Sequence, residues 1–283
     1  MSALILDGRA LADRLQEPLR ARAAALAART GDAPRLAIIG AGTTGAAAVY
    51  AASVARAARR VGIEPVAVEV PPGTDAWELA ARIAALNADP SVAGIVIAQP
   101  LPAPLDDSGL VDLVDPAKDV DGATAVNAGR LARGEPAAAP ATALAVMEIL
   151  RANQIEVAGR RAVVVGRSPV IGRPVAALLI AADATVTVCH RRTPDLARET
   201  RRAEILVVAA GAPGLIRAEM VQPGCVVIDC GITARDGGVV GDVDFAAVSQ
   251  VAAAITPVPG GVGPVTAVML ASQTLDAAER LAG

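Results

Sequence analysis

The sequence predicts an α/β protein of two domains, each built around a parallel sheet. Short apolar strands alternate with helical segments in two separate series, and this alternation is typical of βαβ units. A glycine-rich turn joins the first strand of the second series to the helix that follows it. The chain has 283 residues, of which 53% are hydrophobic and 19% are charged. This length and composition allow one large or two ordinary domains with well-formed cores.

The first series is recognised by hydrophobic periodicity and by the residues that stop each element. Apolar residues recur with helical spacing in the long Arg/Ala/Leu-rich segment near the N-terminus, and the first strand after it ends in glycine. The last strand is halted by Gln99-Pro100-Leu101-Pro102. We predict helices over 11–30, 46–61 and 75–88 and strands over 35–40, 65–70 and 94–98.

The second series starts after the Ala/Pro-rich stretch 135–140. We predict helices over 142–153, 175–182 and 193–202 and strands over 161–165, 185–189, 205–210 and 225–230. This order describes at least one mononucleotide-binding half of a Rossmann-like domain. The predicted division is therefore 1–140, together with the C-terminal helix 267–283, for the first domain and 141–266 for the second.

One segment near the C-terminus, 256–266, has six Gly or Pro among its eleven residues. Proline fixes φ and lacks an N–H, and glycine allows the backbone to approach a ligand closely, so we predict a tightly specified loop that is neither helix nor strand. The loop follows the apolar run 251–255 and precedes a helical run, 267–281, as in a strand–loop–helix ligand site. A kinked surface connector is the alternative.

Composition excludes several classes of partner. The formal net charge is −3, and no run of Lys or Arg is long enough for a nucleic-acid interface. The N-terminus lacks a basic n-region followed by a long apolar run, and other apolar runs are shorter than a membrane span. We expect a soluble, cytoplasmic protein.

Cysteine and histidine are too few for a structural zinc site or a hydrolytic triad. Cys189, Cys225 and Cys230 include no CxxC pair, and His190 is the sole histidine. We expect three buried reduced thiols and no metal.

The glycine-rich turn, Gly166-Arg167-Ser168 through Gly172, has the spacing G-x-S-x-x-x-G. Its glycine permits a tight turn, and the N–H groups at the start of the next helix can receive a pyrophosphate. The second strand of this series ends at Cys189-His190-Arg191-Arg192 without the acid that bonds the ribose 2′-OH of NAD. Arginines there can bind a 2′-phosphate, which favours NADP. A plain βα turn and a solvated basic face are the alternatives.

Several blocks together are similar to the methylenetetrahydrofolate dehydrogenase/methenyltetrahydrofolate cyclohydrolase family, and the resemblance spans essentially the whole chain. Besides the loop 256–266 and the turn 166–174, they are the segments 100–102, 116–122, 127–131, 184–190, 227–232 and 240–243. The loop and the block Lys118-Asp119-Val120-Asp121-Gly122 are the most specific.

The resemblance implies two α/β domains with a cleft between them, folate held mainly by the first domain and NADP by the second. Hydride passes from 5,10-methylenetetrahydrofolate to the nicotinamide, and in bifunctional members water then opens the methenyl product. The loop 256–266 would line the cleft, and a homodimer through the cofactor domain is expected. Tyr50 and Asp121 are implied as catalytic residues. The implied substrate contacts are Tyr50, Pro100, Leu101, Asp121, Gly260, Gly261 and Pro264. The implied cofactor contacts are Gly166, Arg167, Ser168, Gly172, His190, Arg191, Arg192, Gly211, Gly231 and Ile232.

The chain departs from the family pattern where the family has a catalytic lysine one helical turn after the tyrosine. Val54 occupies that position, and we expect it still to face the cleft. Lys118 is the sole lysine against 25 arginines, but replacement of lysine by arginine would have left Arg at 54. Arg56 lies about 200° further around the helix and stays protonated, so it is no substitute base.

Further departures surround the pterin site. The glutamine that supports the lysine in the family falls on Ala98, with Gln99 one residue later and so on the other face of a strand. Ala123-Thr124 replaces a bulky Phe-His, which predicts a wider pocket, and Val265 replaces a methionine.

Hydride transfer requires no protein base, whereas water addition needs proton transfer. We therefore predict a dehydrogenase with weak or absent cyclohydrolase activity. The alternatives are a redox-inactive folate- or NADP-binding paralogue and an NADP dehydrogenase for another substrate.

Overall fold

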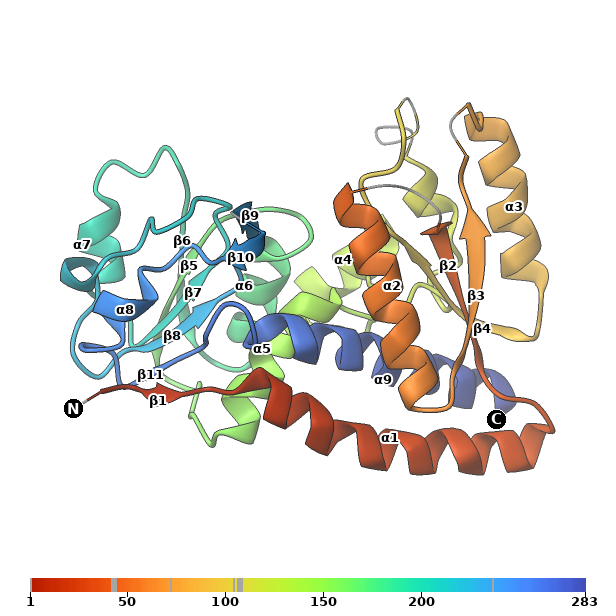
Figure 1. Ribbon diagram of the computed structural model, residues 1–283, viewed down its shortest axis with the longest axis horizontal. Helices are drawn as coiled ribbons and strands as arrows, with labels where there is room; N and C mark the ends of the chain where they lie inside the picture. The colour runs from red at the N-terminus through yellow and green to blue at the C-terminus, as the bar shows by residue number, and fades with distance from the viewer. Residues whose placement is uncertain (1, 42–44, 72, 104, 106–108, 236) are drawn as a thin grey trace. The chain divides into compact units, whose positions relative to one another are not determined.

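The computed structural model describes residues 2–41, 45–71, 73–103, 105, 109–235 and 237–283. The chain divides into two compact units (Figure 1), one formed by residues 1–12 and 142–266 and the other by residues 13–141 and 267–283. The sequence-based division placed the first twelve residues with the wrong unit. They join residues 142–266 because β1 (Leu4–Ile5) pairs in parallel with β11 (Ala254–Ile255).

The unit of residues 13–141 and 267–283 contains a three-stranded parallel sheet in the order β3-β2-β4. Its strands are β2 (Arg35–Ala41), β3 (Glu64–Glu69) and β4 (Val92–Ile97), and every residue of β4 is buried. Ile38 lies opposite Ala67 on one side and Val96 on the other. β4 contains only apolar residues and glycine, and β2 does so from Leu36 onward, as expected when both faces of a parallel sheet are covered.

Helices α2 (Gly45–Arg60) and α3 (Ala76–Ala88) follow β2 and β3 and pack on the sheet. Asp75 caps α3 by accepting a hydrogen bond from the backbone N–H of Glu78 at 2.7 Å. The sequence predicted these elements to within a few residues. It did not predict the short 3₁₀ turn η2 (Leu110–Leu113) or α4 (Ala125–Ala132), which continue the chain after β4.

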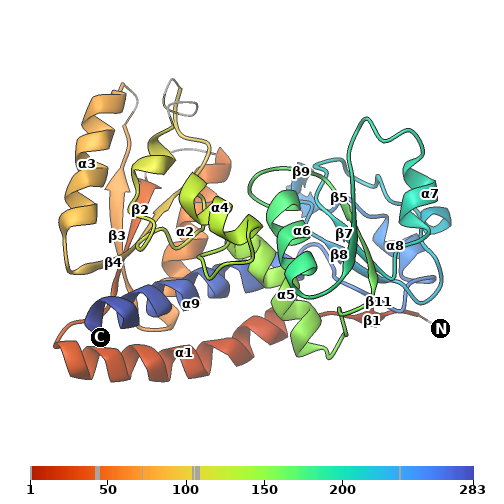
Figure 2. The same ribbon diagram turned by 180° about the vertical axis from the view of Figure 1, so that it is seen from behind.

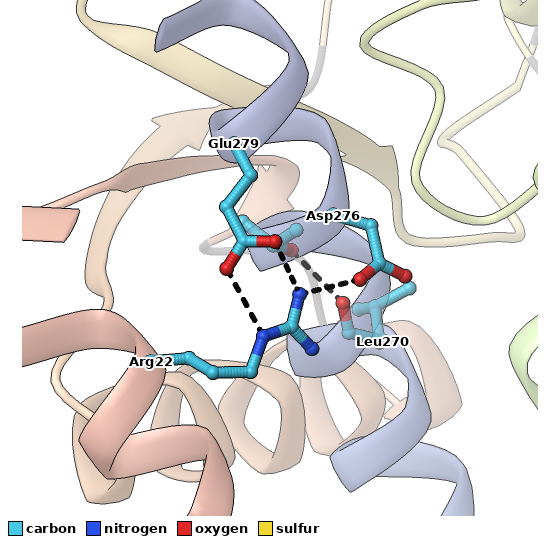
Figure 3. A network of polar contacts seen from close by, with 5 residues as sticks. Arg22, Leu270, Asp276 and Glu279 are labelled. Atoms are coloured by element: carbon cyan, nitrogen blue, oxygen red, sulfur yellow. Dashed lines mark hydrogen bonds and ion pairs between the residues drawn. The ribbon is translucent and has the colours of Figure 1, made fainter. Parts of the chain in front are cut away.

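Two long helices lie side by side in both ribbon views (Figures 1 and 2), namely α1 (Gly8–Thr30) from residue 13 onward and α9 (Val262–Ala282) from residue 267 onward. Arg22 of α1 joins them: its guanidinium contacts Asp276 at 2.6 Å and Glu279 at 2.8 Å (Figure 3). These side chains are 34 to 46% exposed, so solvent screens the pairs, and we expect a contribution on the order of 1 kcal/mol.

Helix α9 begins at Val262, five residues before the predicted start. The sequence-based interpretation of 256–266 as loop throughout is therefore wrong for its second half. Pro264 is compatible with helix because it lies in the first turn, where backbone N–H groups have no partner within the helix.

The other unit contains a six-stranded sheet in the order β1-β11-β8-β7-β5-β6, and all five pairings are parallel. The remaining strands are β5 (Arg161–Val165), β6 (Thr185–Cys189), β7 (Ile205–Val208) and β8 (Val226–Asp229). The bounds of β5 and β6 are those predicted from the sequence. The chain runs from β5 to β6 on one side and then to β7 on the other, so the strand order reverses at β5.

Helices cover both faces of this sheet. Figure 2 shows α5 (Ala141–Ala152) and α6 (Gly172–Ala181) in front of it, and Figure 1 shows α8 (Phe245–Val248) on the opposite side. Further short elements of this unit are α7 (Leu196–Thr200), the hairpin of β9 (Thr233–Arg235) and β10 (Gly238–Val240), and the 3₁₀ turn η3 (Ala218–Met220). None of the helices in the described ranges is long and apolar enough to cross a membrane.

Candidate functional site

Tyr50 and Asp121, which are 71 residues apart in sequence, meet in the unit of residues 13–141 and 267–283. Tyr50 lies on α2, and Asp121 lies in the segment between β4 and α4. The Tyr50 hydroxyl donates a hydrogen bond to Oδ2 of Asp121 at 3.3 Å. The backbone N–H of Ala141 donates to Oδ1 of the same carboxylate at 3.1 Å. The fold therefore brings together the two residues that the resemblance implied as catalytic.

The turn that carries Asp121 is shaped by a second carboxylate, that of Asp119, which is 4% exposed. Asp119 accepts hydrogen bonds from Ala123 N–H, from both the N–H and the hydroxyl of Thr124, and from the Asn127 side chain, at 2.8 to 3.1 Å. Thr124 is 1% exposed and caps α4, so it stabilises the turn, whereas Ala123 is exposed. The wider pocket expected from Ala123-Thr124 stays a prediction.

Gln273 on α9 is a second support for Asp121 that the sequence analysis missed. Its Nε2 donates to the carbonyls of Val120 at 2.7 Å and Ala139 at 2.9 Å, and its Oε1 accepts from Ala139 N–H at 3.0 Å. The amide thus joins the two segments whose ends, Asp121 and Ala141, are themselves hydrogen-bonded. A glutamine within the largely apolar helical run near the C-terminus was the available signal, because a glutamine that becomes buried must find hydrogen-bond partners.

Burial determines the electrostatics of this pair. Desolvation raises the pKa of Asp121 from 3.8 to about 6, although the hydrogen bond from Ala141 opposes the rise. Desolvation and the neighbouring carboxylate also raise the pKa of Tyr50 well above 10. At neutral pH Asp121 is therefore an acceptor, and Tyr50 keeps its proton. A carboxylate offers about four lone-pair positions, of which Tyr50 and Ala141 use two, so about two remain for a ligand with N–H donors.

Val54, at the family's lysine position, is 2% exposed. It belongs to a buried stripe on α2 with the spacing of one helix face, formed by Ala47, Ala51, Val54 and Ala58. Tyr50 lies at the border of this stripe and is half-buried, whereas Arg56 is exposed. Position 54 therefore contributes packing and carries no charge or proton.

Ala98 and Gln99 lie just beyond β4 rather than within it. Ala98 is fully buried and Gln99 is exposed, so the two side chains are in opposite environments. Pro100 is also exposed, but Leu101 is 7% exposed and packs in a hydrophobic cluster with Leu110 and Val114. The backbone of Leu101, rather than its side chain, is left for a ligand.

The glycine-rich turn lies at the carboxyl end of β5 in the other unit. Gly166 has φ of 125°, and a Cβ there would lie 2.1 Å from the carbonyl oxygen of Ala209, so only glycine fits. The Ser168 hydroxyl accepts hydrogen bonds from the N–H groups of Ile171 at 3.2 Å and Gly172 at 3.4 Å, at the start of α6. Arg167 is exposed beside this helix start.

The residues after β6 lie beside this turn because β5 and β6 are neighbours, and Gly166 N–H donates to the carbonyl of Cys189. Thr193 accepts a hydrogen bond from His190 N–H at 2.9 Å, and His190 Nδ1 accepts one from Arg192 N–H at 3.2 Å. Arg191 and Arg192 are exposed. Cations therefore follow β6 where an NAD site usually has an acid.

The other implied cofactor residues follow β7 and β8, on the opposite side of β5. Gly211 and Ile232 are exposed, and Gly231 is buried. The implied substrate residues Gly260, Gly261 and Pro264 also belong to this unit, and Gly260 accepts a hydrogen bond from Arg9 N–H at 3.2 Å. The substrate contacts implied by the resemblance are thus divided between the two units.

The carboxyl edge of this sheet fits a phosphorylated dinucleotide. The close-packed glycine turn lets a ligand approach the start of α6, and Arg167, Arg191 and Arg192 suit a 2′-phosphate. Within the described residues, no cluster of three His, Cys, Asp or Glu could hold a metal ion. All three cysteines are buried free thiols, and burial raises the pKa of Cys225 to about 12. Lys118 bonds the carbonyls of Leu86 and Asp89 at the end of α3.

A Rossmann-like unit with this edge, together with a second α/β unit that carries a half-buried, hydrogen-bonded Tyr–Asp pair, is typical of a two-domain dehydrogenase that uses a dinucleotide. Comparison with known proteins gives the family. The catalytic domain of tetrahydrofolate dehydrogenase/cyclohydrolase matches residues 6–121, and the NAD(P)-binding domain of the same family matches residues 140–282. The chain belongs to the tetrahydrofolate dehydrogenase/cyclohydrolase family.

Individual relatives match over nearly their whole length. The bifunctional protein FolD of Acinetobacter baumannii is 47% identical over 281 residues, which cover 99% of this chain and 100% of the relative. The crystal structure of the bifunctional FolD from Campylobacter jejuni has a TM-score of 0.95 at 40% identity and covers 99% of both chains. The Trypanosoma brucei enzyme, solved with NADP and an inhibitor, has a TM-score of 0.94 at 40% identity, with 99% of this chain and 98% of that one covered.

Proposed function

We propose that this protein is an NADP-dependent 5,10-methylenetetrahydrofolate dehydrogenase whose methenyltetrahydrofolate cyclohydrolase activity is weak or absent. The observation that carries the proposal is the hydrogen-bonded Tyr50–Asp121 pair in a chain that has Val54 at the family's lysine position. The pair supports folate binding. The valine removes the group that the hydrolysis step needs and that hydride transfer does not need.

Asp121 binds the pterin as an ionised acceptor. Its two remaining lone-pair positions suit the paired N–H donors of an aminopyrimidine ring, and such charge-assisted bonds are about twice as strong as neutral ones. Ala141 N–H and the Tyr50 hydroxyl fix the direction of the carboxylate, and Gln273 and Asp119 hold the segment beneath it. Tyr50 contributes its ring as an apolar surface beside the bound ligand.

The cofactor binds at the carboxyl edge of β5, with Gly166, Ser168 and Gly172 at the pyrophosphate and Arg167, Arg191 and Arg192 at the 2′-phosphate. When bound, NADP supplies the carbon that accepts the hydride. The chain's contribution to this step is to align donor and acceptor carbons and to exclude water, and it needs no side chain that gains or loses a proton.

The cyclohydrolase reaction differs from hydride transfer because it requires proton transfer. Water addition to the methenyl product needs proton transfers, for which a positioned acid or base is worth about 10²- to 10⁴-fold. Val54 cannot supply one, and the raised pKa of Tyr50 keeps that hydroxyl protonated throughout the neutral range. Loss of the lysine therefore reduces the second reaction while leaving the first intact.

The test is to measure both activities in the wild-type protein and in Val54→Lys. We expect NADPH formation from methylenetetrahydrofolate in both proteins. Hydrolysis of methenyltetrahydrofolate, followed by its absorbance, is expected to be weak or absent in the wild type and faster in the lysine variant. Val54→Met is the matched control, because it has a long side chain without charge and must not restore hydrolysis. Wild-type hydrolysis as fast as the dehydrogenase reaction would contradict the proposal.

The same assays separate the alternatives. A redox-inactive paralogue would bind NADP or folate without forming NADPH, and a dehydrogenase for another substrate would bind NADP but not folate. The family resemblance also predicts a homodimer formed through the cofactor unit and a cytoplasmic location. Sedimentation analysis of the purified protein and cell fractionation test these two expectations.

A further inference from the structure

Asp242 is a fully buried aspartate, 0% exposed, that lies after β10 at the carboxyl edge of the six-stranded sheet. Its Oδ2 accepts hydrogen bonds from the N–H groups of Ala210 at 2.7 Å and Gly211 at 2.8 Å, and its Oδ1 accepts one from Ala212 at 2.8 Å. One carboxylate therefore holds three consecutive N–H groups of the segment that follows β7.

Asp229, the last residue of β8, performs the same task for the next segment. It is 3% exposed, its Oδ1 accepts from Gly231 N–H at 2.8 Å and Asp242 N–H at 3.1 Å, and its Oδ2 accepts from Val243 N–H at 3.0 Å. Its own N–H donates to the hydroxyl of Thr256, the first residue after β11, at 2.8 Å. The segments after three adjacent strands are thus joined in one buried network.

The packing leaves no room for variation at two glycines. A Cβ on Gly231 would lie 2.4 Å from the carboxyl carbon of Asp242, and a Cβ on Gly241 would lie 2.0 Å from Oδ2 of Asp229. Two buried carboxylates this close repel one another, and burial together with Asp242 raises the pKa of Asp229 to about 6. Six hydrogen bonds from backbone N–H groups offset the cost of burying these two charges, and they hold the loops in one conformation.

The position of the network relative to the sheet indicates what the constraint serves. A dinucleotide with its pyrophosphate at β5 and its 2′-phosphate at the arginines after β6 has its adenosine half on that side. Its nicotinamide half must therefore extend across β5 toward the segments after β7 and β8. These are the segments that Asp242 and Asp229 hold, and they contain Gly211, Gly231 and Ile232.

We infer that Asp242, supported by Asp229, is a positioning residue for the nicotinamide half of the cofactor. It acts through the backbone of residues 210–212 and 231 rather than by touching the reacting atoms. The inference rests on the proposed function, because it takes NADP as the ligand. The buried carboxylate keeps these backbone segments rigid beside the nicotinamide, where hydride transfer requires alignment of the reacting carbons.

The experiment compares two ligands by calorimetry: NADP⁺ and 2′,5′-ADP, which has the adenosine half and the 2′-phosphate but no nicotinamide. Asp242→Asn keeps the size of the side chain but leaves only one oxygen to accept the three N–H bonds. We expect it to bind NADP⁺ about tenfold more weakly than the wild type and 2′,5′-ADP within about twofold. In kinetics, KM for NADP⁺ rises and KM for the folate is unchanged.

Asp244→Asn is the matched control: Asp244 is exposed, accepts one N–H bond from Ala247 and caps α8, for which asparagine is equally suited. We expect unchanged affinity for both ligands. Asp229→Asn is the second variant. Like Asp242→Asn, this variant keeps an oxygen for two of three N–H bonds. Asp229 acts on residues 210–212 only through Asp242, so we expect the same pattern with a smaller loss, which also tests the inference if Asp242→Asn does not fold.

Each outcome decides the matter. The inference would be overturned if Asp242→Asn, or Asp229→Asn where Asp242→Asn does not fold, bound NADP⁺ as tightly as the wild type. The proposed function would remain intact. Equal losses for NADP⁺ and 2′,5′-ADP would also overturn it, because they would mean general damage to the unit. A wild-type protein that binds neither ligand would refute the proposed cofactor itself and the inference with it.

Discussion

Replacement of Asp121 by asparagine is expected to make the protein more stable and less able to bind folate. The carboxylate and the amide have almost the same shape, so packing is preserved. What changes is charge, because the carboxylate is half-buried beside Tyr50 and Ala141 and the amide is neutral at every pH. The variant therefore measures separately how much stability the charge costs and how much folate affinity it provides.

The magnitude follows from the pKa of Asp121. A rise from 3.8 to about 6 on folding means that ionisation destabilises the folded state by about 3 kcal/mol once the pH exceeds 6. The sign follows from proton binding: between pH 4 and 6 the folded protein holds a proton that the unfolded chain releases, so stability falls as pH rises through this interval. The amide loses part of one hydrogen bond, worth about 1 kcal/mol, which leaves a net gain of about 2 kcal/mol at pH 8.

Thermal unfolding followed by circular dichroism at pH 8 and pH 4.5 measures this. We expect Asp121→Asn to melt several degrees above the wild type at pH 8 and at the same temperature at pH 4.5. Folate binding moves in the opposite direction: two bonds to a charged acceptor are lost, at about 1.5 to 3 kcal/mol each, so KM for methylenetetrahydrofolate rises at least about 100-fold. A variant that melts below the wild type at pH 8 would refute this account of the site.

Three further predictions concern the same machinery. Because the pKa of Asp121 is about 6, kcat/KM for the folate falls on acidification with a midpoint near pH 6, and a wild-type profile that stays flat to pH 5 would contradict its role as an ionised acceptor. Gln273→Ala removes three buried hydrogen bonds, so we expect it to lower the free energy of unfolding by about 2 to 4 kcal/mol. It is also expected to raise KM for the folate but not for NADP⁺. Gln222→Ala, in the other unit, is the control for loss of a glutamine. Replacing both Arg191 and Arg192 by alanine is expected to raise KM for NADP⁺ about 100-fold and leave KM for NAD⁺ nearly unchanged, and an equal effect on both cofactors would show that these arginines do not read the 2′-phosphate.

Much of the fold could be predicted from local pattern. The bounds of β5 and β6 followed from apolar runs ended by glycine and histidine, and the helices and strands from α1 to β4 were placed within a few residues. Errors arose where a long-range contact decided the structure. Leu4 and Ile5 form a strand only because Ala254 and Ile255 offer an edge, and no local signal in two residues predicts such a pairing.

The sequence predicted the residues of the candidate site but not the residues that hold them in place. Tyr50, Asp121 and the glycine turn at Gly166 were identified from motifs, whereas Gln273, Asp119 and the Asp229–Asp242 network were not assigned these tasks. Such residues act by bonding backbone groups of distant segments, and sequence spacing carries no record of those distances. For the same reason the sequence did not show that Thr124 is a buried helix cap.

The sequence by itself determined the α/β class, the two series of βαβ units, the family and the absence of a lysine at position 54, because each depends on residue identity or on local periodicity. Only the tertiary structure decided that Val54 lies in a buried stripe, that Asp121 has a raised pKa, and that two buried aspartates hold the loops at the cofactor edge. Burial and electrostatics depend on which segments pack together, and that is a property of the folded chain rather than of any segment alone.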